Sequence, residues 1–177
     1  MNPDAYSKII RKRRLKIAEA ESWKSIGIRL LTVTAIVGIL FSTVFFLTRV
    51  RGISMMPSIH DGDLLLGYRL SNKYAKDDIV QYQHDGQTYI GRIVGMPGDI
   101  IRITEEGQVL INGSASDENL FKTEPGTALQ YPCTVLPDTY FILGDYRTNA
   151  KDSREFGTVS KEDVEGKIIT LLRRRNL

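Results

Sequence analysis

Cysteine is almost absent from this sequence, which contains Cys133 and no other. No intramolecular disulfide can therefore form, and a metal site built on several thiolates is excluded. We interpret Cys133 as a lone structural thiol, and we expect neither a metal nor a cofactor. Many Gram-positive proteins that work outside the cytoplasm also lack disulfides, so the cysteine count leaves the location open.

A large excess of charge is also absent, because the net charge is only +3 over 177 residues. The basic residues crowd into the first thirty positions and do not form a face of a predicted domain. We therefore expect no nucleic-acid partner and interpret the basic excess as a signal of membrane topology. The length allows a membrane anchor and one modest soluble domain with its own core.

One long uncharged run is present, LLTVTAIVGILFSTVFFL at residues 30–47. With the apolar residues just upstream it approaches the roughly 20 residues that cross a bilayer. We predict a transmembrane helix over residues 29–49. A cleavable signal peptide is the competing interpretation, but the run is too long for one and no small-x-small cleavage site follows it before Arg49.

The residues before this run predict its orientation. Three acidic residues stand there against eight basic ones, which are Lys8, Arg11, Lys12, Arg13, Arg14, Lys16, Lys24 and Arg29. By the positive-inside rule, residues 1–28 form a cytoplasmic segment of a single-pass plasma-membrane protein, and residues 50–177 face outward. Residues 7–23 form either an amphipathic helix on anionic headgroups or a solvated basic tail.

The outward part reads as mainly β, an antiparallel domain of short strands. Apolar or alternating segments recur between turn residues, at 64–70, 78–83, 87–95, 100–104, 108–111, 140–144 and 167–172. Asp85-Gly86 predicts a tight hairpin, while Glu106-Gly107 and Asn112-Gly113 punctuate a second meander. Residues 114–137 are less regular, and we expect a loop-rich insertion there.

Three blocks in this chain resemble the type I signal peptidases of Gram-positive bacteria. They are GISMMPS at 52–58, YIGRIVGMPGD at 89–99 and GDYRTNAKDSREFG at 144–157, in the order of that family. The resemblance implies a signal-peptidase-like β-domain with Ser54 at the nucleophile position, near the membrane surface. It also implies that Asp152 and Arg154 pair to brace the site and that Gly52 lies beside the oxyanion position.

The chain departs from the family where the serine is activated. A serine hydroxyl needs a neighbouring base, and signal peptidases use a lysine that immediately precedes the arginine of the second block. Here that position is Gly91, which carries no side chain. A serine that orients the lysine in the family corresponds to Ala150, so both members of the activating pair are missing.

Two histidines and one nearby lysine are the alternative candidates for the base. His84 would lie roughly 23 Å along its strand from position 91 and is a poor candidate. His60 follows Ser54 closely, although the family has no role for it, and Lys151 reads as a solvated loop lysine. A lysine from a partner chain also stays open.

The resemblance further implies a groove that takes an extended peptide as an added strand. We expect six apolar residues along it, each of which has a core or membrane-contact alternative: Val50, Ile53, Met55, Ile59, Tyr89 and Ile90. That groove can persist without catalysis.

Two functions follow from the sequence, and we favour the first. In the first, the protein binds exported precursors, a signal peptide or a pilin precursor, with weak or no proteolysis. Signal-peptidase-like proteins encoded with Gram-positive pili suggest that it assists pilin or surface-protein assembly with other assembly proteins. In the alternative, it is an active signal peptidase that uses Ser54 with an atypical base. A membrane-anchored β-domain unrelated to signal peptidases is a third, weaker reading.

Overall fold

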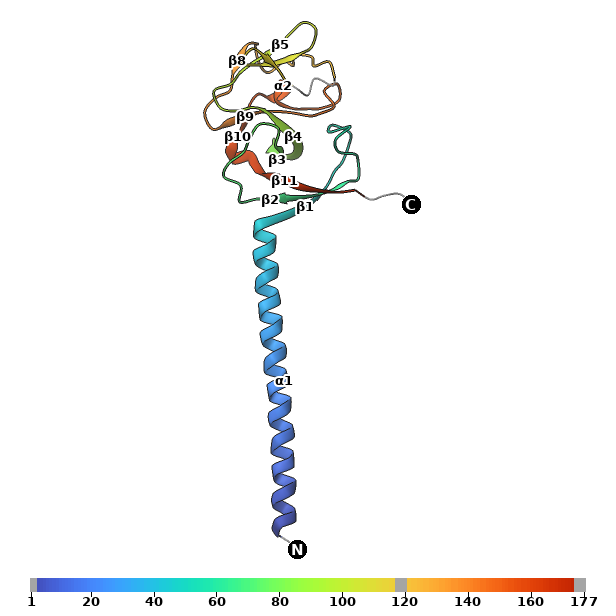
Figure 1. Ribbon diagram of the computed structural model, residues 1–177, viewed down its shortest axis with the longest axis vertical. Coiled ribbons are helices and arrows are strands. Elements are labelled where there is room, and N and C mark those ends of the chain that lie inside the picture. Colours follow the sequence, from blue (N-terminus) through green and yellow to red (C-terminus); the bar gives the residue numbers. More distant parts are fainter. Residues whose placement is uncertain (1–2, 117–120, 174–177) are drawn as a thin grey trace. The chain divides into compact units, whose positions relative to one another are not determined.

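The computed structural model describes residues 3–116 and 121–173, with side chains from Trp23 onward. The chain divides into two compact units, residues 1–43 and 44–177. The first is a single helix, α1 (Pro3–Val44), drawn in blue to cyan in Figure 1. The second contains all the strands.

The apolar part of α1 is long enough to cross a membrane. Trp23–Val44 has a mean hydropathy of 1.9, and its side chains are not buried within the chain. At 1.5 Å per residue this stretch spans about 33 Å, close to the thickness of a hydrocarbon core. The helix nevertheless ends five residues before the predicted boundary at residue 49, because residues 45–49 form a strand.

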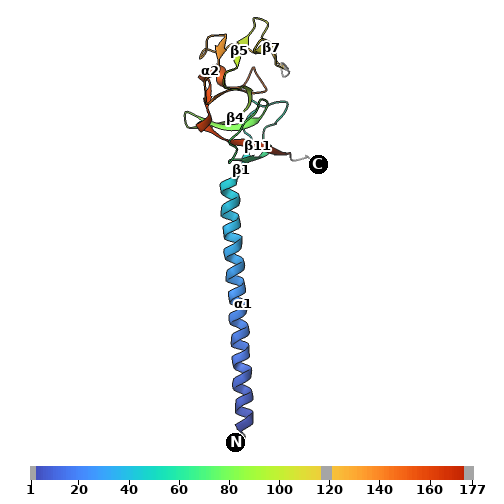
Figure 2. The ribbon, with the colours of Figure 1, turned by 60° about the vertical axis from the view of Figure 1, so that its left-hand side comes forward.

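The fold of the second unit is mainly β, as predicted, and every strand pair is antiparallel. A seven-stranded sheet has the order β1-β2-β11-β3-β4-β9-β10, and a four-stranded sheet has the order β7-β6-β5-β8. The strands of the large sheet are β1 (Phe45–Arg49), β2 (Leu64–Tyr68), β3 (Ile79–His84), β4 (Gln87–Gly95), β9 (Thr139–Leu143), β10 (Val159–Ser160) and β11 (Val164–Leu172). Those of the small sheet are β5 (Ile100–Ile103), β6 (Val109–Ile111), β7 (Ser114–Ala115) and β8 (Cys133–Thr134), and Figure 2 labels two of them, β5 and β7.

The predicted hairpin at Asp85-Gly86 is present. Both residues have positive φ, 48° and 72°, and His84 pairs with Gln87 across the turn. Asn112-Gly113 has the same backbone signature, with φ of 52° and 85°, and joins β6 to β7. These two-residue turns match the twist of the strands that they connect, so they fix the register of each hairpin.

Three apolar clusters hold the second unit together. One lies between the two sheets and includes Val94, Ile101 and Phe141. A second covers the opposite face of β3, β4 and β9 and includes Tyr82 and Ile142. The third, with Val50, Met55, Ile59 and Leu65, lies beneath the loop that follows β1.

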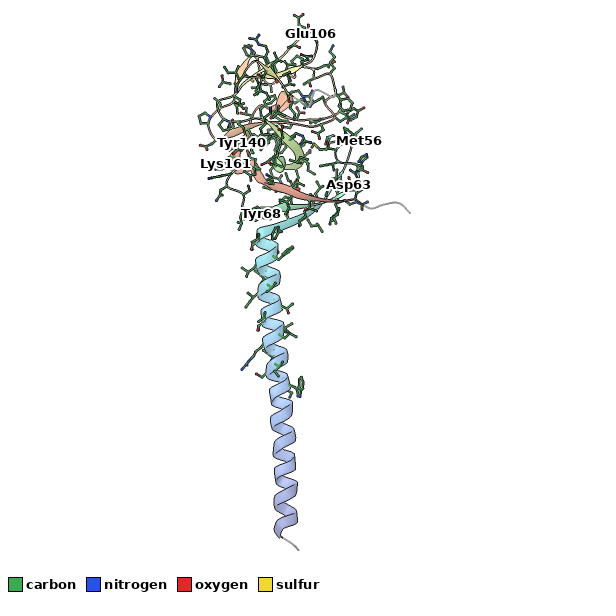
Figure 3. The ribbon with its side chains drawn as sticks, in the orientation of Figure 1. Met56, Asp63, Tyr68, Glu106, Tyr140 and Lys161 are labelled. Atoms are coloured by element: carbon green, nitrogen blue, oxygen red, sulfur yellow. The ribbon has the colours of Figure 1, made fainter. Side chains whose placement is uncertain are left out.

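Two short helical segments, α2 (Ser153–Phe156) and η1 (Lys161–Asp163), connect the last strands. Residues 114–137 contain only β7 and β8 as regular elements in their described part. In Figure 3, Met56 and Asp63 lie on the other side of the β-unit from Tyr140 and Lys161, so the loop after β1 and the β9–η1 region are well separated.

Candidate functional site

The loop that carries Ser54 is fixed at its two ends. The Val50 N–H donates to the carbonyl of Asp63 at 2.9 Å, and the Gly62 N–H donates to the carbonyl of Val50 at 3.0 Å. Within the loop, Gly52 adopts φ of +90°, and its N–H donates to the Asp61 carboxylate at 2.7 Å. A side chain at Gly52 would be strained, which gives a local reason for glycine here.

Ser54 itself is half-buried, and the third block lies directly against it. The Tyr146 N–H donates to the Ser54 carbonyl at 2.9 Å. A β-carbon at Gly144 would lie 2.8 Å from that same carbonyl oxygen and 2.3 Å from Cβ of Ala150. The structure therefore brings Ser54 and Ala150 together around Gly144, where there is no space for a side chain.

Gly91 lies in the middle of β4, opposite Val80 of β3. A β-carbon at this position would lie 2.6 Å from Cγ2 of Ile142 and 3.4 Å from Cε1 of Tyr82. Both of these residues belong to the apolar cluster on that face. Gly91 itself offers no side chain that could act as a base, and Ile142 fills the space that a β-carbon there would enter.

Two buried ion pairs brace this region. Arg92 donates through Nε and Nη2 to the two oxygens of Asp145, at 2.9 and 2.8 Å. Arg92 Nη2 also approaches Ser58 Oγ at 3.4 Å, so the pair links β4, the third block and the Ser54 loop. A bidentate arginine–carboxylate pair fixes both distance and orientation.

The second brace is the predicted pair of Asp152 and Arg154. The Asp152 carboxylate accepts from Arg154 Nε at 2.8 Å and from the Gly144 N–H at 3.0 Å. Arg154 Nη2 donates to the carbonyls of Arg147 and Ala150 at 2.7 and 3.2 Å. Burial alone would lower the pKa of Arg154, but the hydrogen bond and charge of Asp152 outweigh it and raise that pKa.

A cavity of about 820 Å³ opens beside Ser54. One wall is the continuous segment 47–55, and the other is the start of β4, residues 87–90, with Gln81, Asn149 and Lys151 completing the lining. Of the six predicted groove residues, five are in this lining: Val50, Ile53, Met55, Tyr89 and Ile90. Ile59 is not in the lining, and its side chain is buried in the cluster beneath the loop together with those of Val50 and Met55.

The first half of β4 has an open edge along this groove. Pairing with β9 begins only at Arg92, so residues 87–91 have a strand partner on the β3 side alone within the described chain. The Ile93 N–H donates to the Asp78 carbonyl, and the Ile93 carbonyl accepts from the Asp77 N–H. Both backbone groups of Ile93 therefore point toward the β3 side. Because these directions alternate along an antiparallel strand, Thr88 and Ile90 present their backbone groups at the open edge.

Comparison with known proteins identifies the family. The family described as "Signal peptidase, peptidase S26" matches residues 23–172. The chain belongs to this family. A probable signal peptidase I-2 of Synechocystis is 33% identical over 126 residues, which are 64% of this chain and 56% of that protein. A signal peptidase I of Bacillus caldolyticus is 32% identical over 137 residues, 67% of this chain and 74% of that protein.

A solved structure of a signal peptidase I from Enterococcus faecalis V583 is also similar. It is 30% identical and has a TM-score of 0.45, with coverage of 56% of this chain and 98% of that one. The chain spans only 56% and 63% of the length of two of its cyanobacterial relatives, from Synechocystis and Leptolyngbya laminosa. The family and the mainly β fold predicted from the sequence are confirmed.

In this signal peptidase relative, the three alternative bases have different surroundings. His84 ends β3 and stacks on Phe156, with ring centroids 4.2 Å apart. His60 is exposed, and it is not in the lining of the groove. Lys151 does line the groove together with Ser54, although its side chain is exposed.

Several residues of this region were not singled out from the sequence. Arg92 and Asp145 stand in the second and third blocks, and the sequence contains no direct signal that they pair. Gln81 and Thr88 also line the groove, and they stand on the two strands of the predicted hairpin. On the same hairpin, the Gln83 amide donates to Thr88 Oγ1 at 2.8 Å. The pattern of residues 87–95 predicted a strand here, and the groove beside it was implied by the family resemblance.

Proposed function

We propose that this signal peptidase relative binds extended segments of exported precursor proteins in the groove beside Ser54, with weak or no cutting. One observation carries this: position 91 lacks the base, and Ile142 occupies the space that a side chain there would enter. A general base typically contributes on the order of 10² to 10⁴ in rate, so a serine without one is left with slow chemistry.

The groove keeps what peptide binding requires. No strand of the described chain pairs with Thr88 and Ile90 at the open edge of β4, and an extended peptide can add there as a strand. Val50, Ile53 and Met55 form the facing wall, beside the half-buried Ser54. Backbone pairing gives affinity that depends little on sequence, which suits a protein that receives different precursors.

The clients that we propose are signal-peptide-bearing precursors, pilin precursors among them. The protein would hold them for assembly of pilins or other surface proteins, together with assembly proteins of the same system. We further propose that Trp23–Val44 spans the plasma membrane once, with the basic N-terminus in the cytoplasm and the β-unit outside. Epitope tags at the two ends, probed on intact and permeabilised cells, test that orientation.

Activity is tested on the full-length protein in detergent. It is incubated with a precursor peptide and, separately, with a serine-acylating inhibitor, beside an active signal peptidase as positive control. We expect binding of the peptide, no cleavage above background and no acylated protein by mass spectrometry. Cleavage that disappears in Ser54→Ala contradicts the proposal.

The second candidate is an active signal peptidase with an atypical base. The observation in its favour is that Lys151 lines the same groove as Ser54. Under this candidate, cleavage is lost in both Ser54→Ala and Lys151→Gln, while Lys76→Gln, an exposed lysine outside the groove, retains it. If cleavage survives Lys151→Gln, that residue is not the base.

A further inference from the structure

The charges in the groove lining are all of one sign. Its basic residues are Arg49, Arg51 and Lys151, and no acidic side chain lines it. The three come from different parts of the unit: β1, the Ser54 loop and the segment before α2. All three side chains are exposed.

Within the described part of the chain, these three cations have no counter-ion. Arg49, Arg51 and Lys151 form no ion pair with any residue of the described ranges, 3–116 and 121–173. Two acidic residues that follow the Ser54 loop have other partners, since Asp61 accepts from the Gly52 N–H and Asp63 pairs with Arg173. Three like charges around one concave site create a positive potential that favours an anionic ligand.

We propose that the groove selects extended peptides that carry acidic side chains. This inference rests on the proposed function, because it assumes that a peptide strand lies along β4. In such a strand alternate side chains point to the same side, so carboxylates two residues apart can face the basic wall together. A peptide fits better than a lipid headgroup, because the same cavity contains the open edge at Thr88 and Ile90, which a headgroup does not use.

The test compares two fluorescent peptides of equal length on the full-length protein in zwitterionic nanodiscs. The peptides are identical except that one has Glu at three alternate positions where the other has Gln. We expect the Glu peptide to bind about tenfold tighter at low salt, since three exposed ion pairs together give an effect of that order. The ratio should fall toward one as salt screens the charges.

Variants locate the preference. Arg51→Gln combined with Lys151→Gln should bring the Glu-to-Gln affinity ratio close to one, and Arg51→Lys should preserve it. The matched control is Lys76→Gln with Arg102→Gln, which removes the same charge from exposed positions outside the groove and should keep the ratio. A ratio that survives the groove variants overturns the proposal.

The remaining outcomes distinguish a failure of this inference from a failure of the proposed peptide-binding function. If neither peptide binds, the proposed peptide-binding function fails. If both bind equally, that function stands and the acidic preference is overturned. If the preference vanishes in nanodiscs that contain phosphatidylglycerol, headgroups occupy the three cations and the acidic-peptide assignment is overturned.

Discussion

A β-carbon at Gly91 would lie 2.6 Å from Cγ2 of Ile142. Contacts this short do not occur between real carbon atoms, and the branched Ile142 side chain on β9 has little freedom to rotate away. The backbone oxygen of Leu143, at 3.2 Å, restricts movement on a second side. The packed core therefore leaves no space for a side chain at Gly91.

We expect Gly91→Ala to lower the free energy of unfolding by about 1–3 kcal/mol, the range for overpacked cores. In an Ile142→Ala background the same change should cost less, because the conflicting methyl group is gone. Denaturant unfolding of the four proteins in this double-mutant cycle measures the coupling between the two positions. An identical cost in both backgrounds would show that Ile142 is not the obstacle.

The same contact predicts how activity can be restored. In our proposal Gly91→Lys with Ala150→Ser supplies the base and its orienting hydroxyl, but Cγ2 of Ile142 would still lie 2.6 Å from the β-carbon of the new side chain. We expect cleavage of a precursor peptide only when Ile142→Ala is added, with a gain on the order of 10² or more over the parent. The triple variant with Ser54→Ala is the control. Cleavage by the double variant alone would show that Ile142 moves aside readily.

The bidentate Arg92–Asp145 pair predicts a structural effect. Its side chains are 12% and 4% exposed. Removing one partner leaves a buried charge unpaired, so Arg92→Ala should destabilise the β-unit by about 3–5 kcal/mol. Arg92→Lys should retain only part of the stability that Arg92→Ala loses, because an ammonium group cannot reproduce the paired hydrogen bonds.

Lys167 offers a comparison, since its side chain is 37% exposed, more than that of Arg92, and pairs with Asp78. Lys167→Ala should cost no more than about 1 kcal/mol. Thermal or denaturant unfolding of both variants in the same detergent gives the measurement. Equal losses would mean that burial does not set the strength of these pairs.

The sequence was most informative where local chemistry decides the structure. Asp85-Gly86 predicted a hairpin and Asn112-Gly113 a break within a second meander, because few residues adopt positive φ, and the structure has a two-residue turn at each. The strands of the large sheet were visible through alternation, apart from β1 and β10. β1 was hidden because FFLTR continues an apolar run, and only its pairing with β2 distinguishes a strand from more helix.

The site was less accessible from the sequence than the fold. The blocks around Ser54, Gly91 and Ala150 gave the family and the missing base. That Ile142 fills the space at Gly91 depends on packing between β4 and β9, which are far apart in the sequence. Ile59 was placed in the groove although it packs beneath the loop, since an apolar loop residue fits either place equally well by composition.

The lone thiol of Cys133 is half-buried, and burial raises its pKa.

The open edge of β4 gives the most direct test of peptide addition. Thr88 directs its N–H toward that edge, and proline is tolerated at edge positions whose N–H bonds to no other strand. Thr88→Pro should therefore preserve the fold while it removes one donor from the groove. We expect a precursor peptide to bind about three- to tenfold more weakly, as the loss of one hydrogen bond implies.

Thr88→Ala is the matched control for this variant. Like Thr88→Pro, it removes the Thr88 hydroxyl, which accepts from the Gln83 amide. Unlike Thr88→Pro, it retains the backbone N–H. Fluorescence anisotropy measures binding, and circular dichroism with thermal unfolding checks that both variants remain folded. Equal affinities for the folded alanine and proline variants would mean that the peptide does not pair with β4 at Thr88.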